Sequence, residues 1–461
     1  KIFFDPRQPA TQLQHLRRPL AMASTDLTAT VGKYLDRHML LPLLDFLGSK
    51  KIFPDSELDA ARLQVLEKTN MVDFAMEIYT KLNQGEVPAE MRAKRDEVMT
   101  ALTALQLEVG PLYQIVSDGP LVANLRAERC FTPAFLLEQH SVTAEHVAAL
   151  GKYAKFTYDC GNYGAAASML SCFRLLTSSA DEAFSAQWGK LACDILNGAW
   201  DAALEELGAL KEAIEARSGS TPAVMQLQQR AWLSHWALFL LGNHPSGRSV
   251  VSDLLLSEKY LNAIQTTCPH LLRYLAVAVV TNPRRRHAVK ELVRVIGMER
   301  PTYSDPVTSF LDDLYGSANF ESAQERLAAC AATLDSDFFL CNAEGDFVKY
   351  ARLHLFEGYC RIHERIDLGS LAQKLGMERI AAEKWIVKMV SDAQLNAKID
   401  SKSSHVILGA QPPDVYQQVI ERTKGLSFRS YVLAQNLQQR EQQAARAAKV
   451  ELQEAAAAAA Q

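Results

Sequence analysis

The sequence predicts an all-α protein built as a right-handed superhelix of helical repeats, followed by a winged helix with a small β-hairpin and then by a C-terminal helix. Three observations support this fold. Apolar residues recur at helical spacing along most of the chain. A motif of an aromatic residue, a small residue and a leucine occurs three times. Residues 361–408 carry two short helical periods joined at a glycine turn and followed by two strand-like segments.

The composition is that of an ordinary globular protein, with 48% hydrophobic and 22% charged residues. The net charge of −4, from 49 basic and 53 acidic residues, excludes a surface coated with nucleic acid, so any RNA contact would be local. No apolar run approaches the roughly 20 residues of a membrane span, so no membrane contact is predicted. The eight cysteines form no Cys-x-x-Cys pair, which favours reduced core residues of an intracellular protein.

The predicted organisation has five parts. They are a poorly ordered extension at 1–21, an N-terminal helical region at 22–134, helical repeats at 135–360, a winged helix at 361–411, and a C-terminal helix with an alanine-rich end at 412–461. Within the N-terminal region, residues 110–134 contain three prolines and two glycines, which predict a break between helices.

The repeat motif begins at Tyr163, Trp200 and Phe320. In each copy the small residue follows three positions later and the leucine seven positions later, and a glycine turn precedes the aromatic. This pattern is typical of the second helix of a helical hairpin, in which the small residue lies where two helices cross. Spacing in the thirties, such as the 37 residues between the first two copies, indicates stacked helix pairs of the tetratricopeptide kind. The small residues are Ala166, Ala203 and Ala323.

The winged helix is expected to act as an assembly module. A helix that reads DNA carries base-contacting residues at its start, whereas here that start is Met377–Glu383, which is acidic and apolar. Lys384, Lys388, Lys398 and Lys402 are too few to reverse this interpretation. The hairpin supplies a sheet edge with unpaired backbone groups. The residues predicted to form a subunit interface there are Leu395, Ile399, Val406 and Leu408.

The C-terminal helix begins after Pro412-Pro413. Its apolar residues follow one another at spacings of 4, 7, 7 and 4, which is coiled-coil spacing. The predicted seam is Val415, Val419, Leu426, Leu433 and Leu437. The opposite face is expected to be polar, with Gln417, Glu421, Lys424 and Gln435. A single apolar stripe on a lone helix has nothing to bury against, so this helix is predicted to join a bundle with helices of other subunits.

No catalytic, cofactor-binding or metal site is predicted. The Gly-rich phosphate loops and the Gly-x-Ser-x-Gly elbow are missing. His363-Glu364 starts a zinc-protease motif, but Asp367 stands where the second histidine is required. His235 lies between two tryptophans and is interpreted as a satisfied interior histidine. Asp312 and Asp313 point about 100° apart on a helix and are expected on a solvated face.

One basic cluster leaves a second interpretation open. Arg284, Arg285, Arg286 and Lys290 lie at a predicted helix start, where the helix dipole disfavours cations. A contact with RNA phosphate or with an acidic partner would explain them, and so would a solvated turn.

Helical repeats, a winged helix and a terminal helix, in this order, resemble the PCI family, whose domain would cover about residues 240–411. Longer segments in order along the chain, such as Leu35–Leu47, Tyr260–Leu275 and Leu426–Ser430, are similar to the e-subunit family of eukaryotic translation initiation factor three. Residues 1–21 and the alanine-rich end depart from this resemblance.

The resemblance implies a non-catalytic, cytoplasmic scaffold protein without cofactors, which helps to assemble the factor on the small ribosomal subunit for mRNA recruitment. The implied partners are the other PCI and MPN subunits, including the d subunit. Two alternatives remain: a PCI scaffold of the proteasome lid or signalosome, and a stand-alone RNA-binding module. Co-purification with ribosomal proteins would separate the first from the lead hypothesis, and salt-dependent RNA affinity of the isolated chain would identify the second.

Overall fold

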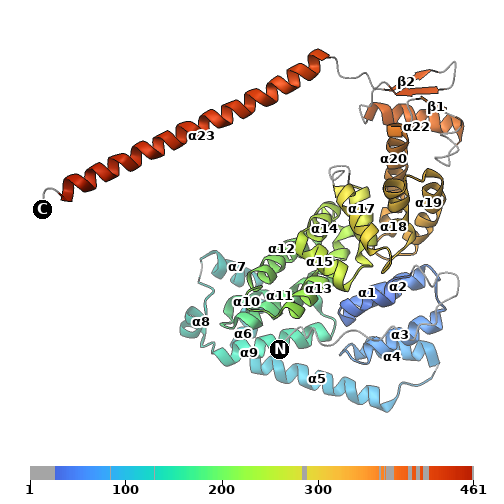
Figure 1. The fold of residues 1–461 in the computed structure, drawn as a ribbon. Helices are drawn as coiled ribbons and strands as arrows, with labels where there is room; N and C mark the ends of the chain where they lie inside the picture. The colour runs from blue at the N-terminus through green and yellow to red at the C-terminus, as the bar shows by residue number, and fades with distance from the viewer. Residues whose placement is uncertain are drawn as a thin grey trace. The chain divides into compact units, whose positions relative to one another are not determined.

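The computed structural model describes residues 26–83, 85–128, 130–282, 288–362, 365–367, 369, 378–392, 397–400, 405–408 and 415–458. These residues are almost entirely helical (Figure 1). The chain divides into two compact units, Lys1–Gly358 and Tyr359–Gln461. The predicted extension at 1–21 lies outside the described residues.

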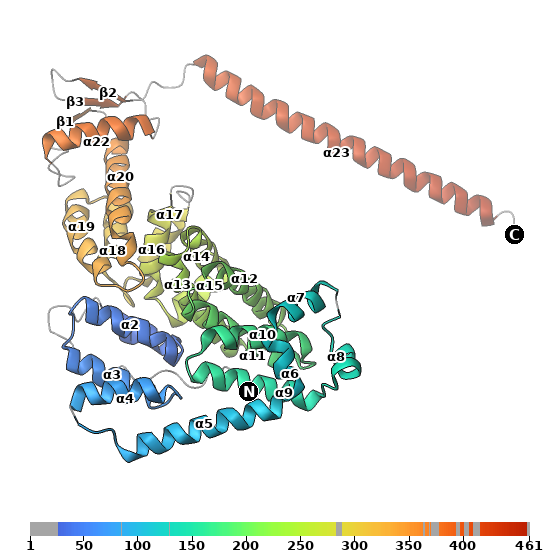
Figure 2. The ribbon, with the colours of Figure 1, turned by 180° about the vertical axis from the view of Figure 1, so that it is seen from behind.

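The N-terminal helices form packed pairs along one side of the first unit (Figures 1 and 2). They are α1 (Thr28–Val31), η2 (Gly32–Tyr34), α2 (Arg37–Ser49), α3 (Asp55–Leu66), α4 (Val72–Asn83) and α5 (Ala89–Val109). The side chain of Asp36 caps α2 by accepting a hydrogen bond from the His38 amide, which satisfies one amide that the helix start leaves free. Helix α2 buries an almost complete apolar face between Met39 and Leu47, which anchors this region in the core.

The segment predicted as a break folds instead into short helices. They are α6 (Pro111–Ser117), α7 (Gly119–Ala127) and α8 (Pro133–His140). Each has a proline in its first two positions, where the missing amide is not needed and the fixed backbone angle suits a helix. Gly110 takes φ = 58° between α5 and α6, a conformation that side-chain-bearing residues avoid. The prolines therefore start helices here and do not merely separate them.

The repeat motif is confirmed at all three positions. Helices α10 (Tyr163–Leu176), α12 (Trp200–Ala216) and α19 (Phe320–Asp335) begin at its aromatic residue. Helix α10 packs on α9 (Ala144–Asp159), α12 packs on α11 (Ala180–Leu196), and α19 packs on α18 (Pro306–Leu311). All three motif alanines are fully buried. Gly161 and Gly198 form the turns with φ of 89° and 71°.

The middle of the unit is the most deeply buried part. It contains α13 (Ala223–Asn243), α14 (Gly247–Leu255), α15 (Glu258–Thr267), α16 (Leu271–Val280) and α17 (Ala288–Glu299). Every residue of α16 and twelve consecutive residues of α13, Arg230–Leu241, are buried. The N-terminal region docks here, because the Trp236 indole donates a hydrogen bond to the Tyr34 carbonyl at 3.1 Å. The unit also contains the π-helix η4 (Asp312–Gly316) and the short η5 (Cys341–Ala343). Helix α20 (Glu344–Ile362) begins in the first unit and its last residues belong to the second.

The second unit contains the expected hairpin and one strand more. Strands β2 (Ala397–Asp400) and β3 (His405–Leu408) pair antiparallel, and β1 (Arg365–Asp367) pairs with the other side of β3. The order is β1-β3-β2, with α22 (Arg379–Asp392) between β1 and β2 in sequence. Strand β1 was not predicted, since a three-residue strand is too short to show alternation.

The last described element is α23 (Val415–Ala458), a continuous helix of 44 residues. It is long enough to extend about 66 Å at 1.5 Å per residue. The predicted helix beyond Pro413 is therefore confirmed, and it includes most of the alanine-rich end.

Candidate subunit interface

Among the residues that the structure describes, the largest group of exposed apolar side chains lies on α23. The predicted seam residues Val419, Leu426, Leu433 and Leu437 are 56–62% exposed, whereas the side chain of Val415 is not described. Five further apolar residues of α23 are also exposed, and they are Tyr416, Ile420, Phe428, Tyr431 and Val432. Soluble proteins rarely leave so many large apolar side chains uncovered, and such surfaces mark interaction sites.

These further residues correct the expectation of a one-sided helix. At 100° per residue the predicted seam spans about 40°, whereas Tyr416, Ile420 and Tyr431 lie roughly 100° further round. Phe428 lies roughly opposite the seam and is 69% exposed, on the face that was expected to be polar. Tyr416, Ile420 and Tyr431 form a second apolar row, which a search for coiled-coil spacing alone does not find. Helix α23 therefore exposes apolar side chains on more than one of its faces.

The winged-helix sheet offers an edge, but with a different strand than the sequence suggested. Ile399 lies in β2, an edge strand, while Val406 and Leu408 lie in β3, which is paired on both sides. The free backbone groups therefore belong to β2 and β1. Leu395 lies outside the described residues.

Only part of the basic cluster can be placed. Lys290 is exposed in the first turn of α17, and Arg294 is exposed one turn later. Arg284, Arg285 and Arg286 lie outside the described residues. Lys290 is therefore the one described member of the cluster, and it shares an exposed helix face with Arg294.

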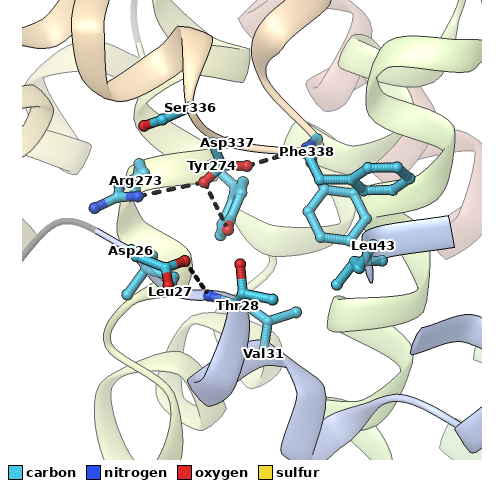
Figure 3. A pocket seen from close by; sticks show the side chains of 11 residues that line it. Asp26, Leu27, Thr28, Val31, Leu43, Arg273, Tyr274, Ser336, Asp337 and Phe338 are labelled. Carbon is cyan, nitrogen blue, oxygen red and sulfur yellow. Dashed lines mark hydrogen bonds and ion pairs between the residues drawn. The ribbon is translucent and has the colours of Figure 1, made fainter. Parts of the chain in front are cut away.

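A buried ionic cluster connects distant parts of the first unit, and Figure 3 shows three of its members, Arg273, Tyr274 and Asp337. Arg273 of α16 is 1% exposed, and its Nε donates to Asp305 Oδ2 at 2.5 Å and its Nη1 to Asp337 Oδ2 at 3.3 Å. The hydroxyls of Tyr303 and Tyr274 donate to the same two oxygens, each at 3.0 Å. Burial raises the pKa of Asp337, although Arg273 opposes the shift.

This cluster fits a structural role. The adjoining cavity, lined by Asp26, Val31 and Leu43 among others, has a volume of about 10 Å³, which is room for one water molecule at most. Asp305 also caps α18 by accepting from the Thr308 amide at 2.7 Å, so its carboxylate is fixed from two sides. The arrangement joins α16, the start of α18 and the loop before η5.

His235 is an interior histidine, as expected, and has a partner that the sequence did not reveal. Its Nδ1 lies 2.6 Å from the Ala231 carbonyl and its Nε2 lies 2.8 Å from Nε2 of His270. The carbonyl requires a proton on Nδ1 of His235, so its Nε2 accepts from His270. Burial lowers the pKa of His235 to about 4 and that of His270 well below its usual value. Tyr34 stacks on the His235 ring with centroids 4.1 Å apart.

The remaining polar candidates do not converge on one site. Asp312 pairs with Arg300 at 3.1 Å, while Asp313 pairs with Arg326 and accepts from the Ser322 hydroxyl. The prediction that Asp312 and Asp313 lie on a solvated face was wrong, since both carboxylates are largely buried and ion-paired. His363 and Glu364 lie outside the described residues, and Asp367 lies in β1.

Two further features concern metals and membranes. Within the described residues, no group of three or more His, Cys, Asp and Glu side chains is arranged to hold a metal ion. Nor does any helix in that part of the chain have the length and apolarity needed to cross a membrane.

Three family models match the chain. They are the eIF3 subunit 6 N terminal domain at residues 26–157, the PCI domain at 327–410, and the C-terminal model of the E subunit of eukaryotic translation initiation factor 3 at 415–434. The last match begins at the first residue of α23 and includes all of its exposed apolar residues except Leu437.

Similar proteins span nearly the whole chain. The E subunit of eukaryotic translation initiation factor 3 from Arabidopsis thaliana is 42% identical over 424 residues, which are 89% of this chain and 96% of that protein. The proteins of the same name from Aspergillus clavatus and Emericella nidulans are 44% and 43% identical, over 87% and 88% of this chain and 90% and 92% of theirs. Identity at this level over this length establishes common descent and a common fold. The chain therefore belongs to the E-subunit family of eukaryotic translation initiation factor 3.

Proposed function

We propose that this chain is a non-catalytic scaffold subunit of translation initiation factor 3, which helps to assemble the factor on the small ribosomal subunit for mRNA recruitment. The observation that carries the proposal is the uncovered apolar surface of α23, which a free monomer would expose to water. Family membership supports the choice of complex, since the relatives carry the name of a factor subunit.

The proposed partners are the other PCI and MPN subunits, including the d subunit, and the proposed location is the cytoplasm. Helix α23 enters a bundle with helices of these subunits. Two rows of apolar side chains suit a helix that contacts two neighbours, whereas a two-stranded coiled coil would need one narrow seam. The β2 edge around Ile399 pairs with, or packs on, a further subunit.

Co-expression tests the α23 contact. The full chain and a chain ending at Gly409 are each expressed with the other subunits and purified through a tag on one of them. We expect the shortened chain to fold and to be recovered in clearly smaller amounts, because its bundle helix is missing. A full-length variant with Leu426→Ser and Leu433→Ser should show the same loss.

The control is a full-length variant with Lys424→Ser and Gln435→Ser, which changes exposed polar residues of the same helix and should assemble normally. Equal recovery of the truncated and full chains would refute the bundle role. The identity of the recovered subunits decides the complex, because lid or signalosome subunits without ribosomal proteins would favour the alternative scaffold.

The basic face around Lys290 supports a subordinate proposal, a local contact with RNA phosphate. Neutralising Lys290 and Arg294 together should weaken RNA binding by the assembled factor at low salt more than at high salt, because phosphate contacts release counterions. Unchanged RNA binding at low salt would remove this contact and leave the scaffold role intact.

A further inference from the structure

A groove in the first unit, remote in sequence from α23 and the sheet edge, has the features of a peptide-binding site. It lies among α6, α7, α10, α11 and α12, which are neighbours in both views (Figures 1 and 2). Its volume is about 630 Å³, within the roughly 300–1,000 Å³ typical of ligand sites. This is far larger than the water-sized cavity beside Arg273.

Helix α10 lines the groove with several small side chains. The residues of α10 that line the groove include Ala165, Ala167, Ser168 and Ser171, and α7 adds Gly119 and Ala123 from the other side. Side chains this small leave room for a peptide backbone to approach the helix surface. The serine hydroxyls among them can accept hydrogen bonds from its amide groups.

The lining carries a net positive charge from two cations and one carboxylate. Lys190 already binds two acids, since its Nζ lies 3.1 Å from Asp194 Oδ2 and 3.0 Å from Glu206 Oε2. Arg126 differs, because within the described part of the chain its guanidinium donates to the uncharged Ser171 Oγ at 3.4 Å and Cys172 Sγ at 3.3 Å. The contact with Ser171 is long and sulfur is a weak acceptor, so an incoming carboxylate could replace both.

The surroundings of Arg126 also orient its exposed side chain. Its guanidinium lies 5.8 Å from the centre of the Phe131 ring, and its contacts with Ser171 and Cys172 direct it from α7 across to α10. A planar, oriented guanidinium of this kind binds carboxylates through paired hydrogen bonds. The expected occupant therefore carries an acidic side chain next to small or aliphatic residues.

We propose that this groove binds an acidic segment of a partner protein, in which a carboxylate pairs with Arg126 and the backbone lies along the small residues of α10. The site is independent of the bundle contact described above. Its test requires no assembly, so failure of one proposal does not imply failure of the other.

The test uses the full chain and short overlapping peptides that tile the other subunits of the factor. Each acidic peptide is paired with a copy in which Asp and Glu are replaced by Asn and Gln, and binding is measured by fluorescence anisotropy. We expect the binding peptides to be acidic and their amide copies to bind about tenfold more weakly or worse, which is the usual effect of losing one charge-assisted hydrogen bond.

Three variants locate the binding. Arg126→Ala should weaken binding by about tenfold, and Arg126→Lys should restore part of it. Ser168→Leu should block the groove from the exposed surface of α10 without touching the charge. The matched control is Arg95→Ala, since Arg95 is an exposed arginine paired with Asp73 on the N-terminal helices, and it should have no effect.

Four outcomes would overturn the proposal. They are the absence of any binding peptide, amide copies that bind equally well, binding that survives both Arg126→Ala and Ser168→Leu, and displacement of the peptides by a single-stranded oligonucleotide that itself requires Arg126. The last result would assign the groove to nucleic-acid phosphate. If Arg126→Ala failed to fold, the amide copies and Ser168→Leu would still decide.

Discussion

Replacing Arg273 with methionine should destabilise the first unit by several kcal/mol. Methionine keeps much of the side-chain volume but removes the cation that binds both Asp305 and Asp337 in the buried cluster. Both carboxylates are at most 6% exposed. Breaking a buried ion pair by removing one partner costs about 3–5 kcal/mol. Two carboxylates lose their cation, but each keeps a hydrogen bond from a tyrosine, Tyr274 or Tyr303. The expected loss of stability therefore stays within this range and does not double.

The pH dependence gives the sharper test. Burial already raises the pKa of Asp337, and without Arg273 this pKa rises further. Between the unfolded pKa of about 3.9 and the raised folded value, the folded variant binds more protons than its unfolded chain. Its free energy of unfolding therefore increases as the pH falls. The deficit of the variant relative to the original chain should be smaller at about pH 5 than at about pH 7.

The measurement is urea denaturation followed by circular dichroism at both pH values. The control is Arg248→Met, because the ion pair of Arg248 with Asp346 is partly exposed and such pairs contribute only about 0–1 kcal/mol. The reasoning would be refuted if Arg273→Met cost no more than Arg248→Met, or if its deficit grew on acidification.

Three further predictions follow from buried or paired residues. Acidification to about pH 5 should lower the free energy of unfolding by about 2 kcal/mol through His235 alone, because its folded pKa of about 4 lies below the unfolded value and only the unfolded chain takes up the proton. In denaturation experiments at several pH values, His235→Gln should make the free energy of unfolding depend less on pH. An unchanged pH dependence would contradict the prediction. Enlarging a motif alanine to leucine should overpack a helix crossing and lower stability by about 1–3 kcal/mol, whereas unchanged melting temperatures at two of the three positions would argue against repeating hairpins. The positions are Ala166, Ala203 and Ala323. Ile399→Pro should weaken assembly in a pull-down while the chain stays folded, since β2 is an edge strand. Val406→Pro should instead disrupt the sheet, because β3 is paired on both sides. Normal assembly of a folded Ile399→Pro chain would exclude the edge contact.

Local signals in the sequence predicted the repeats and the terminal helix well. A glycine turn followed by an aromatic residue marks the first residue of α10 and α12, and both signals act within a few positions. The helices α6 and α7 were missed because proline both ends and starts helices. The sequence alone could not decide between these roles at Pro111 and Pro120.

Interactions between distant residues could not be predicted. Arg273 is separated from Asp305 by 32 residues and from Asp337 by 64. His235 and His270 are 35 residues apart, and neither histidine has a spacing signal that links it to the other. The exposed Phe428 was missed for another reason, since a coiled-coil period was assumed where the helix follows its ordinary one. The groove beside Arg126 could not be predicted either, because several helices that are separate in sequence form it together.

The docking of the first helices has a consequence for synthesis on the ribosome. Lys50 pairs with Asp335 at 2.5 Å, and Phe46 packs edge-on against Phe338 with ring centroids 5.6 Å apart. The two members of the Lys50–Asp335 pair are 285 residues apart, so at about 5–20 residues per second the early helix waits roughly 15–60 seconds for its partner. During that interval the apolar face of α2 lacks part of its native cover. Helix α23 follows the first unit in sequence and is made after it. Its uncovered side chains therefore become available only on chains that already carry every residue of the first unit's core.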